Sequence, residues 1–129
     1  MSAKNVGQLL DRALQLAQSG ALQEAERLYR RILSTDPATA DAWNNLALIC
    51  YQDGRIDQAA QAAERATLLR PNIAQYRLTR GNIAVEQQRV EDALSDFTRA
   101  IALKPDFAEA FYRRALLHHR LRNIEPAAA

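Results

Sequence analysis

The side chains best suited to chemistry in this sequence are two adjacent histidines, His118 and His119, and a single cysteine, Cys50. Imidazoles can ligate a metal, and a thiolate can act as a nucleophile. Neighbouring residues of a helix, however, point about 100° apart, and no third ligand lies at a matching spacing. Cys50 lies on the apolar side of an expected helix, which is typical of a small buried side chain. We therefore expect neither a metal site nor a nucleophile.

Clusters of charged residues form a second group of candidates for catalysis or anion binding. These clusters are Glu24 and Glu26, Glu91 and Asp92, and Arg27, Arg30 and Arg31. The acids lie at the starts of expected helices and the arginines late in one, where each complements the helix dipole. The sequence contains no glycine-rich phosphate loop and no set of serine, histidine and aspartate. We expect no catalytic residue, no cofactor and no enzymatic activity.

Composition limits the partners that the chain can take. It has 129 residues, of which 48% are hydrophobic and 25% charged, an ordinary globular balance. The net charge of +2 is too small to indicate binding to nucleic acid or to an anionic membrane. A single cysteine cannot form an internal disulfide, and the stretch from Met1 to Gly20 lacks the apolar run of a signal peptide. We expect a cytoplasmic protein without membrane insertion.

The sequence contains a repeat, because Pro37, Pro71 and Pro105 are separated by the same interval. This repeat defines the helices that would position any site. Small residues recur at the same interval: Ala25, Ala59 and Ala93, and Ala13, Ala47, Gly81 and Ala115. Apolar residues at three- and four-residue steps predict amphipathic helices over residues 2–18, 22–34, 41–52, 56–69, 74–87, 90–103 and 107–121. The sequence therefore predicts an all-α fold of stacked helical hairpins.

Glycines mark the turns inside the first two hairpins, since Gly20 and Gly54 can take the left-handed conformation that closes a helix. Gln88 stands at the same place in the third hairpin. A non-glycine residue there costs about 1 kcal/mol if its backbone is left-handed. We expect this to be the weakest of the turns.

The pattern resembles the tetratricopeptide repeat family. Its motif appears in the second unit as Trp43, Leu46, Ala47, Cys50, Ala59, Ala63 and Pro71. The resemblance implies a right-handed superhelix that forms a single domain over residues 1–129. Its units would be 6–39, 40–73 and 74–107, followed by a partial unit at 108–129. The pentatricopeptide RNA-binding arrays have a longer period that does not fit.

In that family the first helix of each unit lines a concave groove. The matching residues here are Leu10, Leu14, Asn44, Asn45, Leu48, Gln52, Leu78, Thr79, Asn82, Tyr112, Arg113 and Leu116. Leucines can take apolar side chains of a peptide, and amides can pair with its backbone. The resemblance therefore implies a scaffold that binds a peptide or protein partner. A merely solvated face is the alternative interpretation.

Two sets of ligand-binding groove residues that are known in this family match the present sequence poorly. The carboxylate clamp of chaperone-tail binders has one matching residue in either register, Asn45 or Arg113. The asparagine ladder of O-linked N-acetylglucosamine transferase arrays is matched only by Asn45. The residue pattern of the repeats still resembles that of repeats that precede bacterial glycosyltransferase and sulfotransferase domains. Two further hypotheses therefore remain: a regulatory or substrate-docking arm of an enzyme, and a module that associates with itself.

The repeat also predicts what fills the core and how the chain continues. Large side chains at Tyr29, Trp43, Phe97 and Phe111 are expected to fill the space between helices that approach at the small residues. The same shift places Ile124 on Val90, so that a second-type helix would begin there. We then expect the chain to be part of a longer repeat array or of a larger protein. The face of Phe111, Ala115 and His118 would be uncovered and available for homo-oligomer formation.

Overall fold

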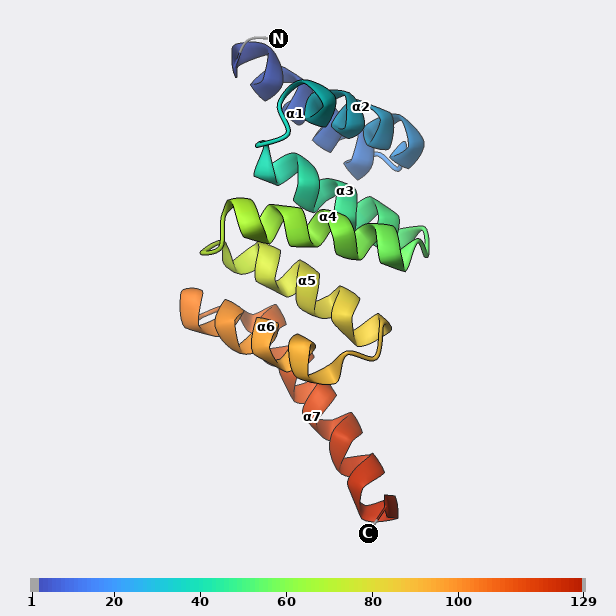
Figure 1. Cartoon of the computed structure of the whole chain (residues 1–129), viewed down its shortest axis with the longest axis vertical. Coiled ribbons are helices and arrows are strands. Elements are labelled where there is room, and N and C mark those ends of the chain that lie inside the picture. The colour runs from blue at the N-terminus through green and yellow to red at the C-terminus, as the bar shows by residue number, and fades with distance from the viewer. Residues whose placement is uncertain (1–2, 129) are drawn as a thin grey trace. The chain divides into compact units, whose positions relative to one another are not determined.

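The computed structural model describes residues 3–128, with side chains from 5 to 122. In that part of the chain the structure consists of seven α-helices and no strand (Figure 1). The helices are α1 (Ala3–Gln18), α2 (Leu22–Thr35), α3 (Ala40–Gln52), α4 (Ile56–Leu69), α5 (Ala74–Glu86), α6 (Val90–Leu103) and α7 (Ala108–Ala128). The predicted all-α fold is confirmed, and the bounds of the first six helices agree with the sequence prediction to within about one residue.

The turns inside the three hairpins share one hydrogen-bond pattern. Gly20, Gly54 and Gln88 have φ angles of 90°, 78° and 61°, so all three are left-handed, as expected for the two glycines. In the third turn the N–H of Arg89 donates to the carbonyl oxygen of Ala84 at 2.9 Å. The first two turns make the corresponding bond, which identifies each as a Schellman motif. The three helices α1, α3 and α5 therefore end in the same way.

The chain divides into two compact units, Met1–Pro71 and Asn72–Ala129. In the first, α1 packs against α2, α2 against α3, and α3 against α4. Small residues allow this close packing: Ala13, Ala25, Ala47 and Ala59 are all fully buried. Tyr29 and Ile32 of α2 are fully buried beside them.

Trp43 does not fill the core as the sequence predicted. It is only partly buried, and its indole N–H donates to the carbonyl oxygen of Pro37 at 2.8 Å. The Arg65 guanidinium lies over its ring, 5.6 Å from the centroid. A polar indole edge favours such a partly buried position, where its donor can be satisfied. The fully buried aromatic side chain of this unit is Tyr29.

An ion pair joins the first hairpin to the turn of the second in this unit. Both terminal nitrogens of Arg55 donate to the carboxylate of Glu26, one of them at 3.0 Å. Arg30, which lies on the same helix as Glu26, donates a further hydrogen bond to this carboxylate, also at 3.0 Å. The hydrogen bond from Arg55 is the largest influence that lowers the pKa of Glu26, to about 2. The pair therefore favours the ionised carboxylate at neutral pH.

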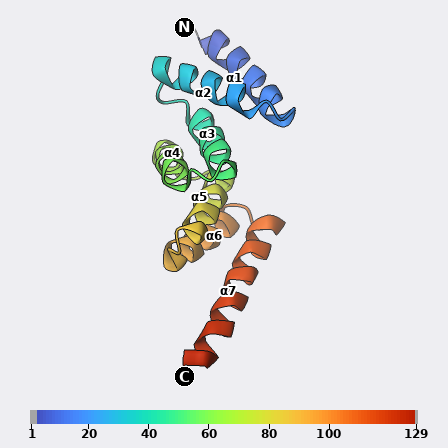
Figure 2. The ribbon, with the colours of Figure 1, turned by 90° about the vertical axis from the view of Figure 1, so that its right-hand side faces the viewer.

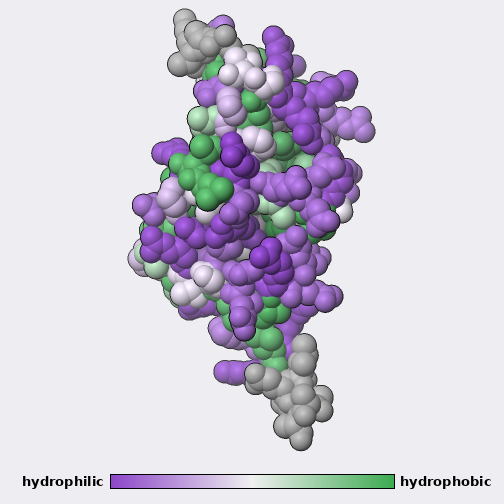
Figure 3. Space-filling view, in the orientation of Figure 1, coloured by the Kyte–Doolittle hydropathy of each residue, from purple (hydrophilic) through white to green (hydrophobic). Residues whose placement is uncertain are grey.

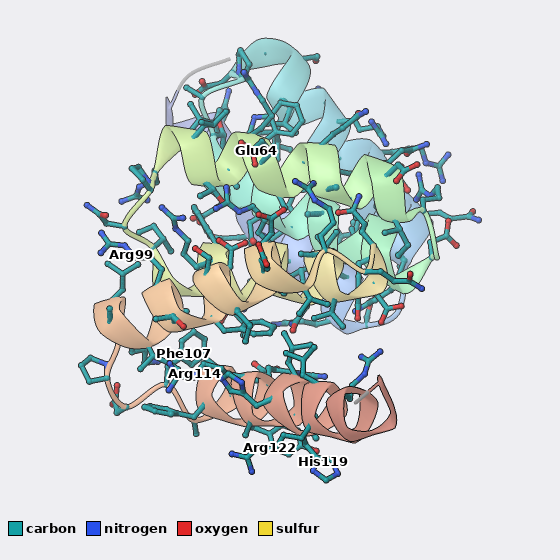
Figure 4. All side chains as sticks on the ribbon, turned by 60° about the horizontal axis from the view of Figure 1, so that its bottom comes forward. Glu64, Arg99, Phe107, Arg114, His119 and Arg122 are labelled. Atoms are coloured by element: carbon teal, nitrogen blue, oxygen red, sulfur yellow. The ribbon has the colours of Figure 1, made fainter. Side chains whose placement is uncertain are left out.

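In the second unit, α5 packs against α6, and α6 against α7. The core consists of Leu78, Ala84, Ala93, Phe97, Ala100, Phe107, Ala110 and Leu117. Figure 4 shows Phe107 and Arg114 on the side of α7 that faces α6, with His119 and Arg122 on the opposite side. Phe111 is 42% exposed, so the prediction that it fills a gap between helices was wrong. Phe107 and Leu117 occupy the contact with α6 instead.

A buried carboxylate holds α5 to α6. Asp96 is 3% exposed, and it accepts two hydrogen bonds from Arg80, from Nε at 2.9 Å and from Nη2 at 2.7 Å. Arg77 approaches the same carboxylate to 3.6 Å. This fork geometry supplies the charge-assisted hydrogen bonds that a buried carboxylate requires.

Helix α7 continues to Ala128. Figure 2 shows that the C-terminal half of α7 extends away from α5 and α6. The prediction that a new helix starts at Ile124 was therefore wrong, because the backbone there continues α7. Arg122 stands one repeat after Gln88, where each earlier unit has its left-handed residue, and here the helix continues. The side chains of Ile124 and Ala127 lie outside the described residues.

Candidate functional site

Two adjoining hollows in the first unit bring together residues of α1, α2 and α3. The first, which we call the apolar hollow, has a volume of about 270 Å³. Leucine, isoleucine and alanine side chains form much of its wall, with amides at its edge. Its lining residues are Leu14, Ala17, Gln18, Leu22, Tyr29, Asn45, Leu48, Ile49 and Gln52.

The second, which we call the acidic hollow, has a volume of about 560 Å³. It is lined by Gly7, Gln8, Leu10, Asp11, Leu14, Asp41 and Asn45. Leu14 and Asn45 therefore border both hollows. A ligand that occupies one hollow must lie beside the other.

Helical periodicity explains this grouping. On α3, Asp41, Asn45, Leu48 and Gln52 follow one another at steps of four, three and four residues, which places them along one face. On α1, Leu10 and Leu14 are related in the same way. Both helices therefore present a mixed leucine and polar face to the hollows.

The hydroxyl group of Tyr29 is an unusual feature of the apolar hollow. Tyr29 is fully buried, and its hydroxyl oxygen makes no close hydrogen bond, although the side chain of Asn45 lies near enough to interact with it. Burial raises the pKa of Tyr29, the side chain of Asn45 opposes this, and the negative charge of Asp41 raises it further. The hydroxyl therefore stays protonated at neutral pH.

The structure brings five of the predicted groove residues together. They are Leu10, Leu14, Asn45, Leu48 and Gln52. Their side chains range from partly buried to exposed. Whether they bind a partner stays a prediction.

Three of the predicted groove residues are buried, so their expected exposure was wrong. Asn44, Leu78 and Thr79 are 5%, 1% and 2% exposed. Leu78 belongs to the core of the second unit, and the Thr79 hydroxyl donates to the carbonyl oxygen of Gln75 at 3.0 Å. Asn44 precedes Asn45 by one residue and points about 100° away from it. The exposed face of these helices is narrower than the sequence indicated.

The remaining four predicted residues belong to the second unit. Asn82 is partly buried, while Tyr112 and Leu116 are 60% and 40% exposed. Arg113 is also exposed and lies 3.9 Å from Glu109 of the same helix. Their role in a groove stays a prediction.

Several lining residues were not among the predicted groove residues. Gln18 and Asp41 lie one helical turn beyond Leu14 and before Asn45, so a four-residue step would have found them. Leu22 and Tyr29 come from α2, which the resemblance did not assign to the groove. No sequence signal pointed to the missing close hydrogen bond at the hydroxyl of Tyr29.

The second unit has a separate hollow of about 410 Å³ at the turn between α5 and α6 and the middle of α7. It is lined by Val85, Gln88, Val90, Leu117, Arg120 and Leu121. Most of this wall is apolar. It contains none of the predicted groove residues.

The residues first considered for chemistry have ordinary surroundings. Cys50 is 1% exposed, and burial raises the pKa of its thiol, which disfavours the nucleophilic thiolate. His118 and His119 are exposed on α7. Across the residues whose side chains are described, no group of three or more histidine, cysteine, aspartate or glutamate residues could hold a metal ion. Within the same described part, no helix combines the length and the apolar character needed to cross a membrane.

Polar and charged residues cover much of the face drawn in Figure 3, with apolar residues gathered at separate places. Successive hairpins of equal length with a shared turn define an α-helical repeat protein. The family model for the tetratricopeptide repeat matches residues 10–74, and a second model of the same repeat matches residues 81–121. The chain belongs to the tetratricopeptide repeat family, which confirms the resemblance seen in the sequence.

Curated relatives are much longer than this chain. Mouse protein O-mannosyl-transferase TMTC1 is 29% identical over 108 residues, which cover 81% of this chain and 12% of the relative. Mouse sperm-associated antigen 1 is 30% identical over 110 residues, which cover 85% of this chain and 12% of the relative. This chain therefore spans only about an eighth of the length of these relatives.

Solved structures show the same fold. An O-GlcNAc transferase mutant from Thermobaculum terrenum has a TM-score of 0.87 and 29% identity over 92% of this chain and 24% of that one. The first TPR of Spaghetti (RPAP3), bound to the HSP90 peptide SRMEEVD, has a TM-score of 0.89 and 20% identity over 95% and 97%. The Yersinia enterocolitica chaperone SycD, in complex with a peptide of YopD, has a TM-score of 0.84 and 17% identity over 96% and 97%.

Proposed function

We propose that this chain is an interaction scaffold that binds an extended peptide or protein segment in the two hollows of its first unit. The observation that carries this proposal is the pair of adjoining hollows, one apolar and one acidic, that share Leu14 and Asn45. Apolar walls can bury a side chain of the segment, while Asn45, Gln18 and Gln52 can bond its backbone. No step of catalysis is required of the chain itself.

Two structural relatives support this use of the fold. RPAP3 was solved with an HSP90 peptide bound, and SycD in complex with a peptide of YopD. At 20% and 17% identity these likenesses concern the fold, so we take from them the class of ligand and not its sequence. We keep the cytoplasm as the proposed location, and we propose no role in nucleic acid binding.

The test is a selection from a random peptide display library, followed by fluorescence anisotropy with the selected peptides. Leu14→Ser removes the apolar side chain that borders both hollows and is 44% exposed. Leu68→Ser is the matched control, because Leu68 is 65% exposed on α4 and lines neither hollow. We expect Leu14→Ser to weaken binding about tenfold and Leu68→Ser to leave it unchanged. Equal binding by both variants, with unchanged circular dichroism, would contradict the site.

A second candidate function is a docking arm of an enzyme. The similarity to TMTC1 and to an O-GlcNAc transferase, each matched over a small part of its length, favours this candidate. Sequencing the gene on both sides of this segment tests it. A neighbouring transferase domain would support the docking role.

Self-association is the third proposal. Phe111, Tyr112 and Leu116 are exposed on α7 at 42%, 60% and 40%. Sedimentation across a concentration series, with Phe111→Ser as the variant, tests this surface. A constant monomer mass would contradict it.

A further inference from the structure

Helix α7 exposes a face whose counterparts on α1, α3 and α5 are buried. Ala13, Ala47 and Gly81 stand at one position of the repeat, and all three are buried. Ala115 stands at the same position of α7 and is exposed. Phe111, one helical turn before it, is 42% exposed. The described chain therefore leaves open on α7 the surface that it closes on the other three helices.

In the second unit, α6 is the helix that closes this surface of α5. Gly81 leaves no room for a β-carbon beside the ring of Phe97 of α6. Next to this contact, Arg80 donates two hydrogen bonds to the buried carboxylate of Asp96. An arginine of the first helix and an aspartate of the second therefore hold this hairpin together beside the small residue.

An arginine recurs at this place on α7. Arg114 stands one repeat after Arg80 and directly before Ala115. It is partly buried and lies on the side of α7 that faces α6 (Figure 4). Its guanidinium is 5.6 Å from the centroid of the Phe111 ring, and its Nη1 is 3.4 Å from the hydroxyl oxygen of Thr98. A carboxylate from a further helix would give Arg114 the stronger, forked partner that Arg80 already has.

The charge of α7 disfavours a second copy of this chain as the occupant of the face. The described side chains of α7 include four arginines and one carboxylate, that of Glu109. Two such helices placed side by side would repel each other. The helices that follow α1, α3 and α5 have acidic residues in their first turns, namely Glu24 in α2, Asp57 in α4, and Glu91 and Asp92 in α6. A helix of this acidic kind complements α7.

We propose that the exposed face of α7 binds an amphipathic helix of a partner protein, in the place that α6 takes on α5. The partner helix has acidic residues in its first turn, and its apolar stripe covers Phe111 and Ala115. A carboxylate beside that stripe accepts the forked hydrogen bonds of Arg114. This helix site belongs to the second unit and is separate from the two hollows of the first.

The probe is a labelled synthetic peptide with the sequence of α6, held helical by a covalent link on its solvent-exposed side. It carries Phe97→Ala, because a phenylalanine there would meet the β-carbon of Ala115. The second hairpin has alanine at both of these positions, Ala47 and Ala63, and both are buried. Fluorescence anisotropy gives the affinity of the probe for the whole chain.

A double-mutant cycle tests the charge pair, with Arg114→Gln in the chain and Asp96→Asn in the probe. Each change alone should weaken binding about fivefold, and both together should weaken it little further, since either one removes the same pair. Arg113→Gln is the matched control, because it removes the same charge from an exposed residue that points about 100° away. The control should change the affinity by less than about twofold.

The apolar contact is tested with Phe111→Ser, which should weaken binding about tenfold. Tyr112→Ser is its matched control, since Tyr112 is 60% exposed and the adjacent position points away from the face. This control should leave binding unchanged. Circular dichroism checks that all four variants of the chain keep their helices.

Other occupants of the face would give different results, and each would overturn the inference. A dimer in sedimentation that Phe111→Ser dissociates would identify a second copy as the occupant. Loss of probe binding in a longer product of the same gene would identify a later segment of the same polypeptide. Absence of probe binding to the folded chain, additive effects in the cycle, or equal weakening by the control variants would also overturn it. None of these results bears on peptide binding in the first unit.

Discussion

Gly81 of α5 lies directly against the ring of Phe97 of α6. A β-carbon at position 81 would be 2.5 Å from Cε1 and 2.8 Å from Cδ1 of that ring. Phe97 is fully buried, so its ring has no free space into which it could move. The absence of a side chain at Gly81 therefore sets how closely α5 and α6 pack.

Gly81→Ala should destabilise the protein by about 1–3 kcal/mol, because the added methyl group overpacks the core. Glycine usually weakens a helix interior, so the change would otherwise be favourable by about 0.5–1 kcal/mol. Gly7→Ala on α1 is the control, since no atom beyond its chain neighbours and the backbone of its own helix lies within 4 Å of the place that its β-carbon would take. Urea unfolding should show opposite signs for the two variants. Stabilisation by both would mean that Phe97 shifts freely.

Gln88→Gly should stabilise the protein by up to about 1 kcal/mol, because Gln88 has a φ of 61° in its turn. The gain is reduced by the greater backbone freedom of glycine in the unfolded chain. Gly54→Ala, at the equivalent place in the second hairpin, should have the opposite effect. Thermal unfolding followed by circular dichroism measures both. A lower melting temperature for Gln88→Gly would show that its side chain contributes more than the strain costs.

The Glu26 and Arg55 pair should make stability depend on pH in the acid range. The pKa of Glu26 is lowered from 4.5 to about 2, so the unfolded chain binds the proton more readily between these values. The contribution of the pair is therefore complete above about pH 4.5 and lost as the pH falls towards 2. Glu26→Gln should cost about 1 kcal/mol at pH 7 and almost nothing at pH 2. The measurement is urea unfolding of both proteins at several pH values, and a constant difference would contradict the prediction.

Replacement of the aromatic residues should rank them by burial. Phe97→Ala should cost about 3–5 kcal/mol, since Phe97 is fully buried. Trp43→Ala should cost less, about 1–2 kcal/mol, because the indole is only partly buried. Trp43 is the single tryptophan, so its fluorescence maximum reports this environment directly. An equal loss of stability in the two variants would show that Trp43 is part of the core, which would contradict this prediction.

The repeat made much of the fold predictable. A shift by one repeat superposes prolines, glycines and alanines, and these residue types fix where helices end and where they approach. The position of Gln88 in the third turn followed from Gly20 and Gly54, and the structure shows that its backbone is left-handed. The end of α7 was not predictable in this way, because the repeat does not show whether a non-glycine residue at this position closes the helix, as Gln88 does, or continues it, as Arg122 does.

The candidate site was harder to predict, because periodicity shows which residues are equivalent but not how far neighbouring helices cover each face. Asn44 and Asn45 are adjacent amides, yet Asn44 is buried and Asn45 borders both hollows. The sequence also assigned Tyr29 to the core, which is confirmed, but it could not show that the hydroxyl makes no close hydrogen bond. That property depends on atomic positions.

Because Cys50 is buried, the reactivity of its thiol reports local unfolding of the protein. A thiol that is 1% exposed and held in its protonated form reacts with an alkylating reagent only while α3 is displaced. The rate of alkylation therefore measures how often the first unit opens. A ligand held between α1 and α3 would slow the reaction in proportion to its occupancy, so mass spectrometry of this one thiol could follow binding without any label on the partner.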